Sequence, residues 1–267
     1  RERSREPEKI IAEAKEMIKS GCKDITLLGQ NVNSYGKGCS HGINFAKLLR
    51  MINDLDGDFR IRFMTSHPKD LSDKLIEAFK NCDKLCKYVH LPVQAGSTKV
   101  LKEMNRKYTR EHYLELVKKL REAVPHITIS TDIIVGFPGE TEEEFEETLS
   151  LANEVEYDSA FTFLYSVREG TPAAKREDQV PEDDKHARFN RLVDAINQTS
   201  ARKNAEYVGR IERVLVDGAS RSKEGTYEGR TDGFKLVNFT GGPGLEGQIV
   251  DVKITDSNTF SLTGEVV

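Results

Sequence analysis

The chain has 267 residues, a formal net charge of −4 and 31% charged residues. This length allows one large domain of about 200 residues beside a small one, and the negative balance excludes a chain-wide basic surface, so any RNA contact must be local. No run approaches the roughly 18 apolar residues of a membrane span, and we expect a cytoplasmic protein that does not contact membranes. The four cysteines are too few and too irregularly spaced for a disulfide framework, so we expect free thiols.

Amphipathic helices and apolar strands alternate along most of the chain. A helix is predicted at 6–19, where isoleucine and alanine recur at helical spacing and Gly21 provides a stop. The same reasoning predicts strands at 24–30, 60–66, 88–96, 127–137 and 160–166, and helices at 43–55, 71–82, 98–123 and 141–155. Strands that alternate with helices in this way are typical of parallel βα units.

Polar residues stand at the end of every predicted strand. They are Gln30 and Asn33, then Thr65, Ser66 and His67, then Gln94 and Ser97, then the run from Gly136 to Glu140, then Tyr165 and Ser166. In a parallel barrel the carboxyl ends of the strands converge on one mouth, where binding sites are built. The alternative is that such residues only open the loops and cap the next helices, as we expect of Ser72 and Thr141.

The stretch TDIIVGFPGETEEEF combines a strand end with a helix start. The strand that carries Asp132 ends at Gly136, and Thr141 with Glu144 forms a capping box. The acidic run that follows is interpreted as a solvated helix start that complements the helix dipole. Glu140 and the backbone at Gly136 belong instead to the predicted mouth.

Other polar or ionisable side chains in the sequence are candidates for a ligand or metal site. Arg106, in KVLKEMNRKYTRE, is either a solvated helix residue or a grip for a carboxylate or phosphate at the pocket edge. Cys82 and Cys86 lack further ligands at metal-site spacing and are interpreted as structural thiols. Lone histidines such as His67 and His90 are more often hydrogen-bonded structural residues than ligands. These residues therefore predict neither a metal site nor a catalytic side chain.

The sequence pattern changes from helical to β-rich after a long polar helix predicted at 182–207. Short β-rich runs separated by glycines predict a small antiparallel barrel at 208–267, with a domain boundary near Val208. Cations interleave with aromatic residues there: Arg210, Arg213, Arg221, Lys223, Arg230 and Lys235 with Tyr227 and Phe234. This favours a single-stranded RNA surface, although acidic residues share the segment and both rings could belong to the core of so small a barrel.

Together, TLLGQNVNSYG, SHP, HLPVQAGS, MNRKYTREHYL and TDIIVGFPGETEEEF resemble the signatures of the radical SAM methylthiotransferases, in the same order. The resemblance is closest to the tRNA 2-methylthioadenosine synthase branch, and the last segment resembles a TRAM domain. It covers almost the whole chain. The branches that modify a ribosomal protein or threonylcarbamoyl-adenosine usually differ in the segment matched here by GQNVNSYG.

The resemblance implies an α/β fold: a partial (β/α) radical SAM barrel over residues 1–207, followed by a TRAM-like RNA-binding β-barrel over residues 208–267. It implies reductive cleavage of S-adenosylmethionine to a 5′-deoxyadenosyl radical, and addition of a methylthio group to carbon 2 of isopentenyl-adenosine in the tRNA anticodon stem-loop. The implied cofactor-binding residues are Gln30, Ser66, Gln94, Arg106, Asp132, Ile134 and Gly136. The expected RNA-binding residues are Arg210, Arg213, Tyr227, Arg230 and Lys235.

The cluster-binding signature of the family is absent from this sequence. Radical SAM chemistry needs a CxxxCxxC loop whose thiolates hold a four-iron cluster, and none of Cys22, Cys39, Cys82 and Cys86 matches it. RERSREPEKI resembles the segment after that loop, so we expect a C-terminal fragment that lacks the first strand and is inactive alone. S-adenosylmethionine and 4Fe–4S clusters are expected in the parent enzyme. The alternatives are a non-catalytic RNA-binding protein with a relic barrel, and a methylthiotransferase of another branch; the sequence identifies neither reductant nor sulfur donor.

Overall fold

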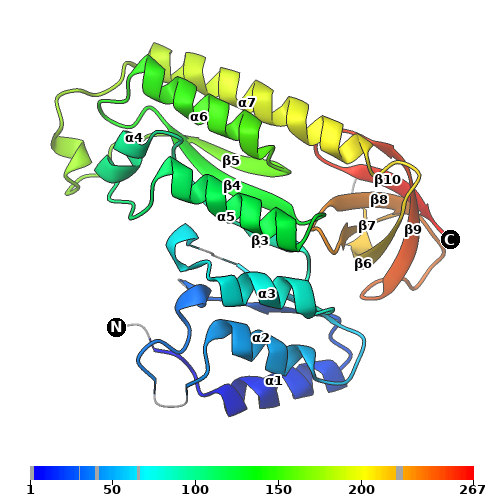
Figure 1. Cartoon of the computed structure of the whole chain (residues 1–267). Helices are drawn as coiled ribbons and strands as arrows, with labels where there is room; N and C mark the ends of the chain where they lie inside the picture. Colours follow the sequence, from blue (N-terminus) through cyan, green and yellow to red (C-terminus); the bar gives the residue numbers. More distant parts are fainter. Residues whose placement is uncertain (1–2, 30, 40–41, 65–66, 221–224) are drawn as a thin grey trace.

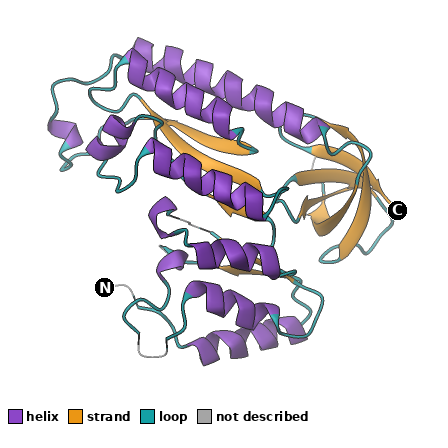
Figure 2. Ribbon diagram, viewed as in Figure 1, coloured by secondary structure: helices purple, strands orange, loops and turns teal. Residues whose placement is uncertain are grey.

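The computed structural model describes residues 3–29, 31–39, 42–64, 67–220 and 225–267 (Figure 1). The chain forms two regions, which we call the half-barrel (residues up to 205) and the small barrel (residues 211–266) (Figure 2). Strands alternate with helices in the half-barrel, whereas the small barrel is built from strands. The domain boundary expected near Val208 lies in the connection between them.

The half-barrel strands are short and all pair in parallel. They are β1 (Asp24–Leu27), β2 (Arg60–Phe63), β3 (Tyr88–His90), β4 (Thr128–Val135) and β5 (Ser159–Leu164). Among the described residues they form two sheets, β1–β2 and β3–β4–β5, and β1 is an edge strand. An isolated bridge between Ile61 and Leu85 links the sheets. The strands begin within one residue of the prediction and end earlier, because their polar ends turn into loops.

Seven α-helices are described. They are α1 (Pro7–Lys19), α2 (Phe45–Asn53), α3 (Asp73–Asn81), α4 (Thr98–Glu103), α5 (Arg110–Ala123), α6 (Glu142–Val155) and α7 (Glu182–Ala205), with short 3-10 turns η1 (Val32–Ser34), η2 (Pro68–Asp70) and η3 (Ala173–Lys175). The predicted caps are confirmed, because the Ser72 and Thr141 hydroxyls accept hydrogen bonds from backbone N–H groups of α3 and α6. Helix α7 packs along α6 and leads into the small barrel (Figure 1).

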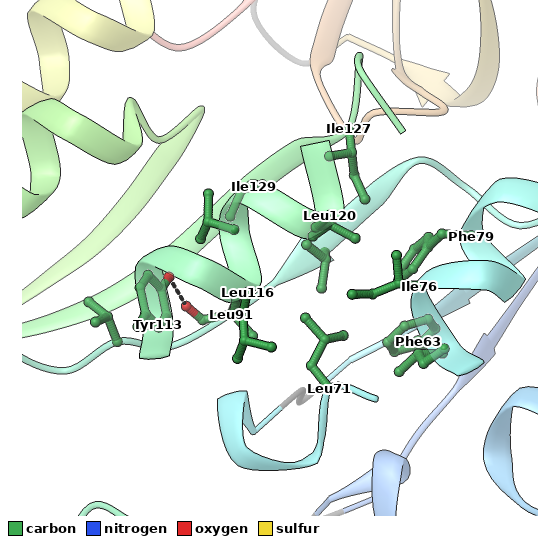
Figure 3. Close-up of a cluster of buried hydrophobic side chains, with 14 of the residues drawn as sticks. Phe63, Leu71, Ile76, Phe79, Leu91, Tyr113, Leu116, Leu120, Ile127 and Ile129 are labelled. Carbon is green, nitrogen blue, oxygen red and sulfur yellow. Dashed lines mark hydrogen bonds between the residues drawn. The ribbon is translucent and has the colours of Figure 1, made fainter. Parts of the chain in front are cut away.

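The helices cover one face of the sheets, which we call the outer face, with a continuous apolar core. Ile76 and Phe79 of α3 lie in the same buried cluster as Leu116 and Leu120 of α5 (Figure 3). Each fully buried side chain of this kind contributes about 1.5–3 kcal/mol. The two sheets are therefore joined on the outer face by packing of α3 against α5.

The prediction of one long helix at 98–123 was wrong, because the chain breaks between α4 and α5. Asn105 adopts a left-handed conformation with φ of 58°, and the Arg106 N–H donates to the Leu101 carbonyl at 2.8 Å. This is the Schellman arrangement that ends a helix. Thr109 then caps α5, so Arg106 lies in a loop near the strand ends.

The small barrel is a closed sheet with the strand order β10-β8-β7-β6-β9. Its strands are β6 (Ile211–Ala219), β7 (Thr226–Thr231), β8 (Leu236–Thr240), β9 (Ile249–Ser257) and β10 (Leu262–Val266). Four neighbouring pairs are antiparallel, as predicted, but β8 and β10 are parallel. An odd number of strands cannot close with antiparallel neighbours throughout, so one parallel pair is a geometric necessity.

Candidate functional site

The ends of β3 and β4 bring two of the predicted site residues together. The Gln94 N–H donates to the Asp132 carbonyl at 2.9 Å, and the Ile134 N–H donates to the Gln94 carbonyl at 2.9 Å. Gln94 is 8% exposed and has a φ of 75°, a conformation that costs free energy for a residue with a side chain. The backbone of Gln94 thus lies beside Asp132 and Ile134, in the second half of β4.

The turn after β4 is tightly packed. Gly136 has a φ of 79°, and a Cβ there would lie 2.4 Å from Cγ of Lys185. Its N–H donates to Glu140 Oε2 at 2.8 Å, and the same oxygen accepts from Arg188 at 3.3 Å. Burial raises the pKa of Glu140, while the hydrogen bond from Gly136 and the Arg188 cation oppose the rise. Lys185 and Arg188 come from α7, and no sequence signal marked them.

The acidic run at the start of α6 is more than a solvated face. The capping box is confirmed, with the Thr141 N–H donating to Glu144 Oε2 at 2.9 Å and the Glu144 N–H donating to Thr141 Oγ1 at 3.3 Å. Glu144 is buried and also pairs with Lys99 at 2.8 Å. Glu142 bridges α6 to α7 through Arg188 at 2.9 Å. The interpretation of the run as solvated was therefore wrong for Glu144, whereas Glu142 is exposed as expected and also pairs with α7.

Three loops at the strand ends contain buried polar atoms that no described residue satisfies. These atoms are Arg106 Nε, Glu140 Oε1 and Tyr165 Oη, in the segments after β3, β4 and β5. Leaving a buried polar group unpaired costs about 1–3 kcal/mol. Donors and acceptors after several strands, without partners among the described residues, fit a polar ligand such as S-adenosylmethionine.

The loops after β1 and β2 form another side of the strand-end region. Asn31 Nδ2 donates to Asp70 Oδ2 at 2.6 Å, and Lys37 pairs with Asp70 at 2.7 Å. His67 precedes the 3-10 turn η2, where burial and the nearby Arg106 cation lower the pKa of its imidazole. The expected site residues Gln30 and Ser66, and the neighbouring Thr65, lie outside the described residues.

The face of the sheets opposite the helices, here the inner face, carries a polar chain. His90 Nε2 lies 3.4 Å from Asp132 Oδ2, and His90 Nδ1 lies 2.8 Å from Ser130 Oγ. Tyr88 Oη is 2.7 Å from the same Ser130 oxygen. His90, interpreted from sequence as a structural histidine, is therefore a direct partner of the predicted site residue Asp132.

Two phenylalanines on β5 extend this inner face. Phe161 and Phe163 are 59% and 50% exposed, and they lie in register with Asp132 and Ile134 of β4. The Phe161 ring is 6.0 Å from the ring of His90. Sequence analysis missed both residues, because an alternating strand does not reveal which of its faces lacks a covering helix.

The cysteines do not fit an iron–sulfur cluster. Cys82 and Cys86 are buried and free, and burial raises the pKa of Cys86 to about 12, which keeps it a neutral thiol. A cluster needs thiolate ligands. Within the described part of the chain, no three His, Cys, Asp or Glu side chains converge as a metal site. We therefore derive no chemical step through a cluster held by these residues.

Most of the cations expected to bind RNA have partners within the chain. Lys235 is buried and pairs with Asp158 at 3.1 Å. Arg213 pairs with Asp58 at 3.0 Å, and the Arg230 guanidinium lies 4.5 Å from the centre of the Phe234 ring.

The other expected RNA-binding residues differ in exposure. Arg210 is exposed and lies 5.0 Å from the centre of the Tyr207 ring. Tyr227 is partly buried and stacks on the core residue Phe239 at 5.9 Å. Arg221 and Lys223, part of the cation pattern seen in the sequence, lie outside the described residues.

Among the described helices, none is both long and apolar enough to span a bilayer.

Two known families match separate parts of the chain. The Radical SAM superfamily matches residues 1–152, and the TRAM domain matches residues 205–267. The chain is 61% identical over all 267 residues to a tRNA-2-methylthio-N(6)-dimethylallyladenosine synthase of Clostridium botulinum (strain Hall), of which it covers 59%. It is 60% identical to the protein of the same name from Clostridium perfringens (strain SM101), and covers 60% of it. The chain thus spans about three fifths of the length of these relatives.

Among solved structures, coproporphyrinogen III oxidase from Escherichia coli, described as a radical SAM enzyme, superposes with a TM-score of 0.53. The superposition covers 86% of this chain and 61% of that one, at 14% identity. At that identity the similarity concerns the fold alone.

Proposed function

Because the chain belongs to the Radical SAM superfamily and carries a TRAM domain, we propose that it is part of a tRNA methylthiotransferase. The proposed reaction adds a methylthio group to carbon 2 of isopentenyl-adenosine next to the anticodon, in the cytoplasm. One observation carries the proposal: the chain is 61% identical over its whole length to relatives that are named for this modification. The two domains divide near Val208 in this proposal.

The strand-end region is the proposed S-adenosylmethionine site. When bound, this cofactor supplies the radical precursor. Arg106 is proposed to bind its carboxylate, because the guanidinium retains a buried Nε without a partner among the described residues. Glu140 Oε1 can accept a hydrogen bond from the ligand, and Tyr165 Oη can donate or accept one. The remaining proposed contacts are Gln94, Asp132, Ile134 and Gly136, with Gln30 and Ser66.

The iron–sulfur clusters of the proposed enzyme require ligands other than the described residues. Anaerobic reconstitution of this chain with iron and sulfide is expected to leave no stoichiometric four-iron cluster, because suitably spaced thiolates are missing. Iron and sulfide analysis with absorption spectroscopy measures this. Bound iron near four atoms per chain, with a defined cluster spectrum, would contradict the expectation.

The small barrel, with the residues that lead into it, is the proposed contact for the anticodon stem-loop, and Arg210, which directly precedes β6, is exposed. Arg210→Glu should weaken stem-loop binding by this chain, and binding should weaken as salt rises because phosphate contacts release counterions. Lys19→Glu, an equal charge change on the exposed end of α1, is the matched control. Arg213 and Lys235 are poorer targets, because changing them also breaks ion pairs with Asp58 and Asp158, and Arg230 shares the Phe234 ring with Arg62 of the half-barrel. Equal loss in both variants would indicate non-specific charge attraction.

The modification itself is tested with the full-length gene in a strain that lacks its own methylthiotransferase. Mass spectrometry of tRNA nucleosides should detect 2-methylthio-isopentenyl-adenosine, and Arg106→Ala should abolish it. Lys107→Ala, beside Arg106 but exposed, should retain it.

Other outcomes of this experiment identify the alternatives. A methylthio group on threonylcarbamoyl-adenosine or on a ribosomal protein would assign the chain to another branch. Stem-loop binding without any modification would support the non-catalytic RNA-binding protein.

A further inference from the structure

The turn between β7 and β8, residues 232–235, enters the amino-terminal end of the half-barrel. The Phe234 ring lies 4.9 Å from the ring of Tyr88, at the start of β3. Two guanidinium groups flank the same ring, with Arg62 at 4.9 Å and Arg230 at 4.5 Å from its centre. Phe234 is therefore held by cation–π contacts from β2 and from its own barrel.

The backbone of this turn and of the end of β7 also bonds to both sheets of the half-barrel. Arg62, in β2, donates to the Thr231 carbonyl at 3.0 Å. Thr128, in β4, donates from Oγ1 to the Gly233 carbonyl at 2.7 Å. Arg60, also in β2, donates to the Arg230 carbonyl at 2.8 Å. The guanidinium groups of Arg60 and Arg62 are almost fully buried, at 3% and 6% exposure of their side chains.

These contacts lie on strands of both sheets of the half-barrel, β2 and β4. Backbone hydrogen bonds between its two sheets occur, among the described residues, at the Ile61–Leu85 bridge, and the outer face is joined through α3 and α5. A backbone bridge with packing on one face constrains the angle between two sheets less than packing on both faces does. A contact on the inner face, between β2 and β4, adds that second constraint.

We infer that the β7–β8 turn is a wedge that fixes the angle between the two sheets of the half-barrel, with Phe234 as its positioning residue. The strand-end region contains His67 after β2 and Gln94 after β3. Their spacing therefore depends on a turn of the small barrel at the opposite end of the strands. This inference goes beyond the proposed function and holds for any ligand at the strand ends.

The conformation of the turn identifies the ring as the essential part. Phe234 has a φ of 64°, in the left-handed region where glycine or asparagine is more comfortable. The backbone path alone therefore gives no reason for phenylalanine. The neighbouring Gly233, by contrast, is explained by steric restriction, because a Cβ there would lie 3.0 Å from the Thr128 side chain.

Hydrogen exchange of the whole chain tests the wedge. Phe234→Gly removes the ring while relaxing the backbone, and it should speed exchange at the seam between the sheets about tenfold or more. The seam amides are those of Ile61, bonded to the Lys84 carbonyl at 2.8 Å, and of Cys86, bonded to the Ile61 carbonyl at 2.9 Å. The Leu91 amide, bonded within the β3–β4 sheet, should not change. Phe234→Tyr should restore slow exchange, because it keeps the aromatic face.

Phe260→Gly is the matched control, because Phe260 is 76% exposed in the same small barrel. Unchanged seam exchange in folded Phe234→Gly would overturn the inference. If that variant does not fold, Phe234→Leu decides: it keeps apolar bulk without an aromatic face, and wild-type seam exchange in it would equally overturn the inference. Spin labels on exposed positions of α1 and α5, Lys15 and Lys118, should also show a broader distance distribution in the variant.

Discussion

The small barrel and the half-barrel differ in how completely their strands are paired and in how large their apolar cores are. The small barrel closes its sheet, but its described residues provide a small apolar core of seven buried side chains. The half-barrel has a large continuous core, yet its described strands fall into two sheets with an open edge. One region has complete backbone pairing and little apolar burial, and the other has the reverse. Each therefore gains from contact with its neighbour.

Contacts within the chain, two of them between the regions, engage three of the cations that were expected to form an RNA surface. Arg213, Arg230 and Lys235 looked from sequence like an RNA surface, but they pair with Asp58, Phe234 and Asp158. Burial lowers the pKa of Lys235, and the Asp158 carboxylate opposes that shift. The two regions, which match different sequence families, are thus joined by ion pairs.

The largest expected effect comes from breaking the joint between the regions. Arg62→Met removes a side chain that is 6% exposed, donates to the Thr231 carbonyl across the joint at 3.0 Å and pairs with Asp24 at 2.7 Å. Loss of one partner of a buried pair should lower the free energy of unfolding by about 3–5 kcal/mol. Urea unfolding of the whole chain measures it.

Arg50→Met is the control for this change, because Arg50 pairs with Glu77 at 3.1 Å on the surface. Exposed pairs contribute about 0–1 kcal/mol. Equal losses of unfolding free energy in the two variants would mean that the contact between the regions does not stabilise the chain.

The closed sheet of the small barrel should tolerate little extra volume. A Cβ on Gly229 would lie 2.3 Å from the Leu215 carbonyl oxygen, so Gly229→Ala should cost about 1–3 kcal/mol by overpacking. Thermal unfolding followed by circular dichroism measures this. Gly242→Ala is the control, since nothing lies within 4 Å of a Cβ there. Two equal melting temperatures would show that the barrel has slack.

The half-barrel should lose less when one of its local helix signals is removed. Thr141→Ala eliminates the hydroxyl that caps α6 and should cost about 1 kcal/mol. Chemical denaturation provides the measurement, and Thr141→Ser, which keeps the accepting oxygen, should match the wild type. A loss as large as that of Arg62→Met would indicate that α6 capping, rather than the joint, controls stability.

The smallest effect is a pH dependence at the strand ends. His67 Nδ1 accepts a hydrogen bond from the Lys69 N–H at 3.2 Å, which requires a neutral ring. Because burial and Arg106 lower the pKa of His67, the unfolded chain binds the proton first as pH falls. The contribution of His67 to stability is therefore complete above the ordinary imidazole pKa of about 6.5. It is lost as pH falls through the lower pKa that His67 has in the folded state.

His67→Asn separates this effect from other titrations, because an amide oxygen can accept the same hydrogen bond without titrating. The difference in unfolding free energy between wild type and variant, followed by urea titration from neutral to mildly acidic pH, should shrink as pH falls. A difference that is constant with pH would exclude His67 as the titrating group.

Local patterns predicted much of the fold. Alternating periodicities identified the strand starts within one residue, and the Thr141–Glu144 spacing identified the cap of α6. Both depend on neighbours within a few positions, which a single sequence displays directly. The break at Asn105 was missed, because the same residues fit one long amphipathic helix and only the Schellman hydrogen bond distinguishes two.

The sequence also placed Gln94 and Asp132 at a common set of strand ends, because parallel strands bring their carboxyl ends together. It could not reveal that His90 contacts Asp132, or that Lys185 of α7 lies against Gly136. Nor could it separate Arg210, which is exposed, from Lys235, which is buried against Asp158. Charge and helical or strand periodicity are properties of the local chain, whereas burial depends on which distant segment arrives, and only the packed tertiary structure decides that.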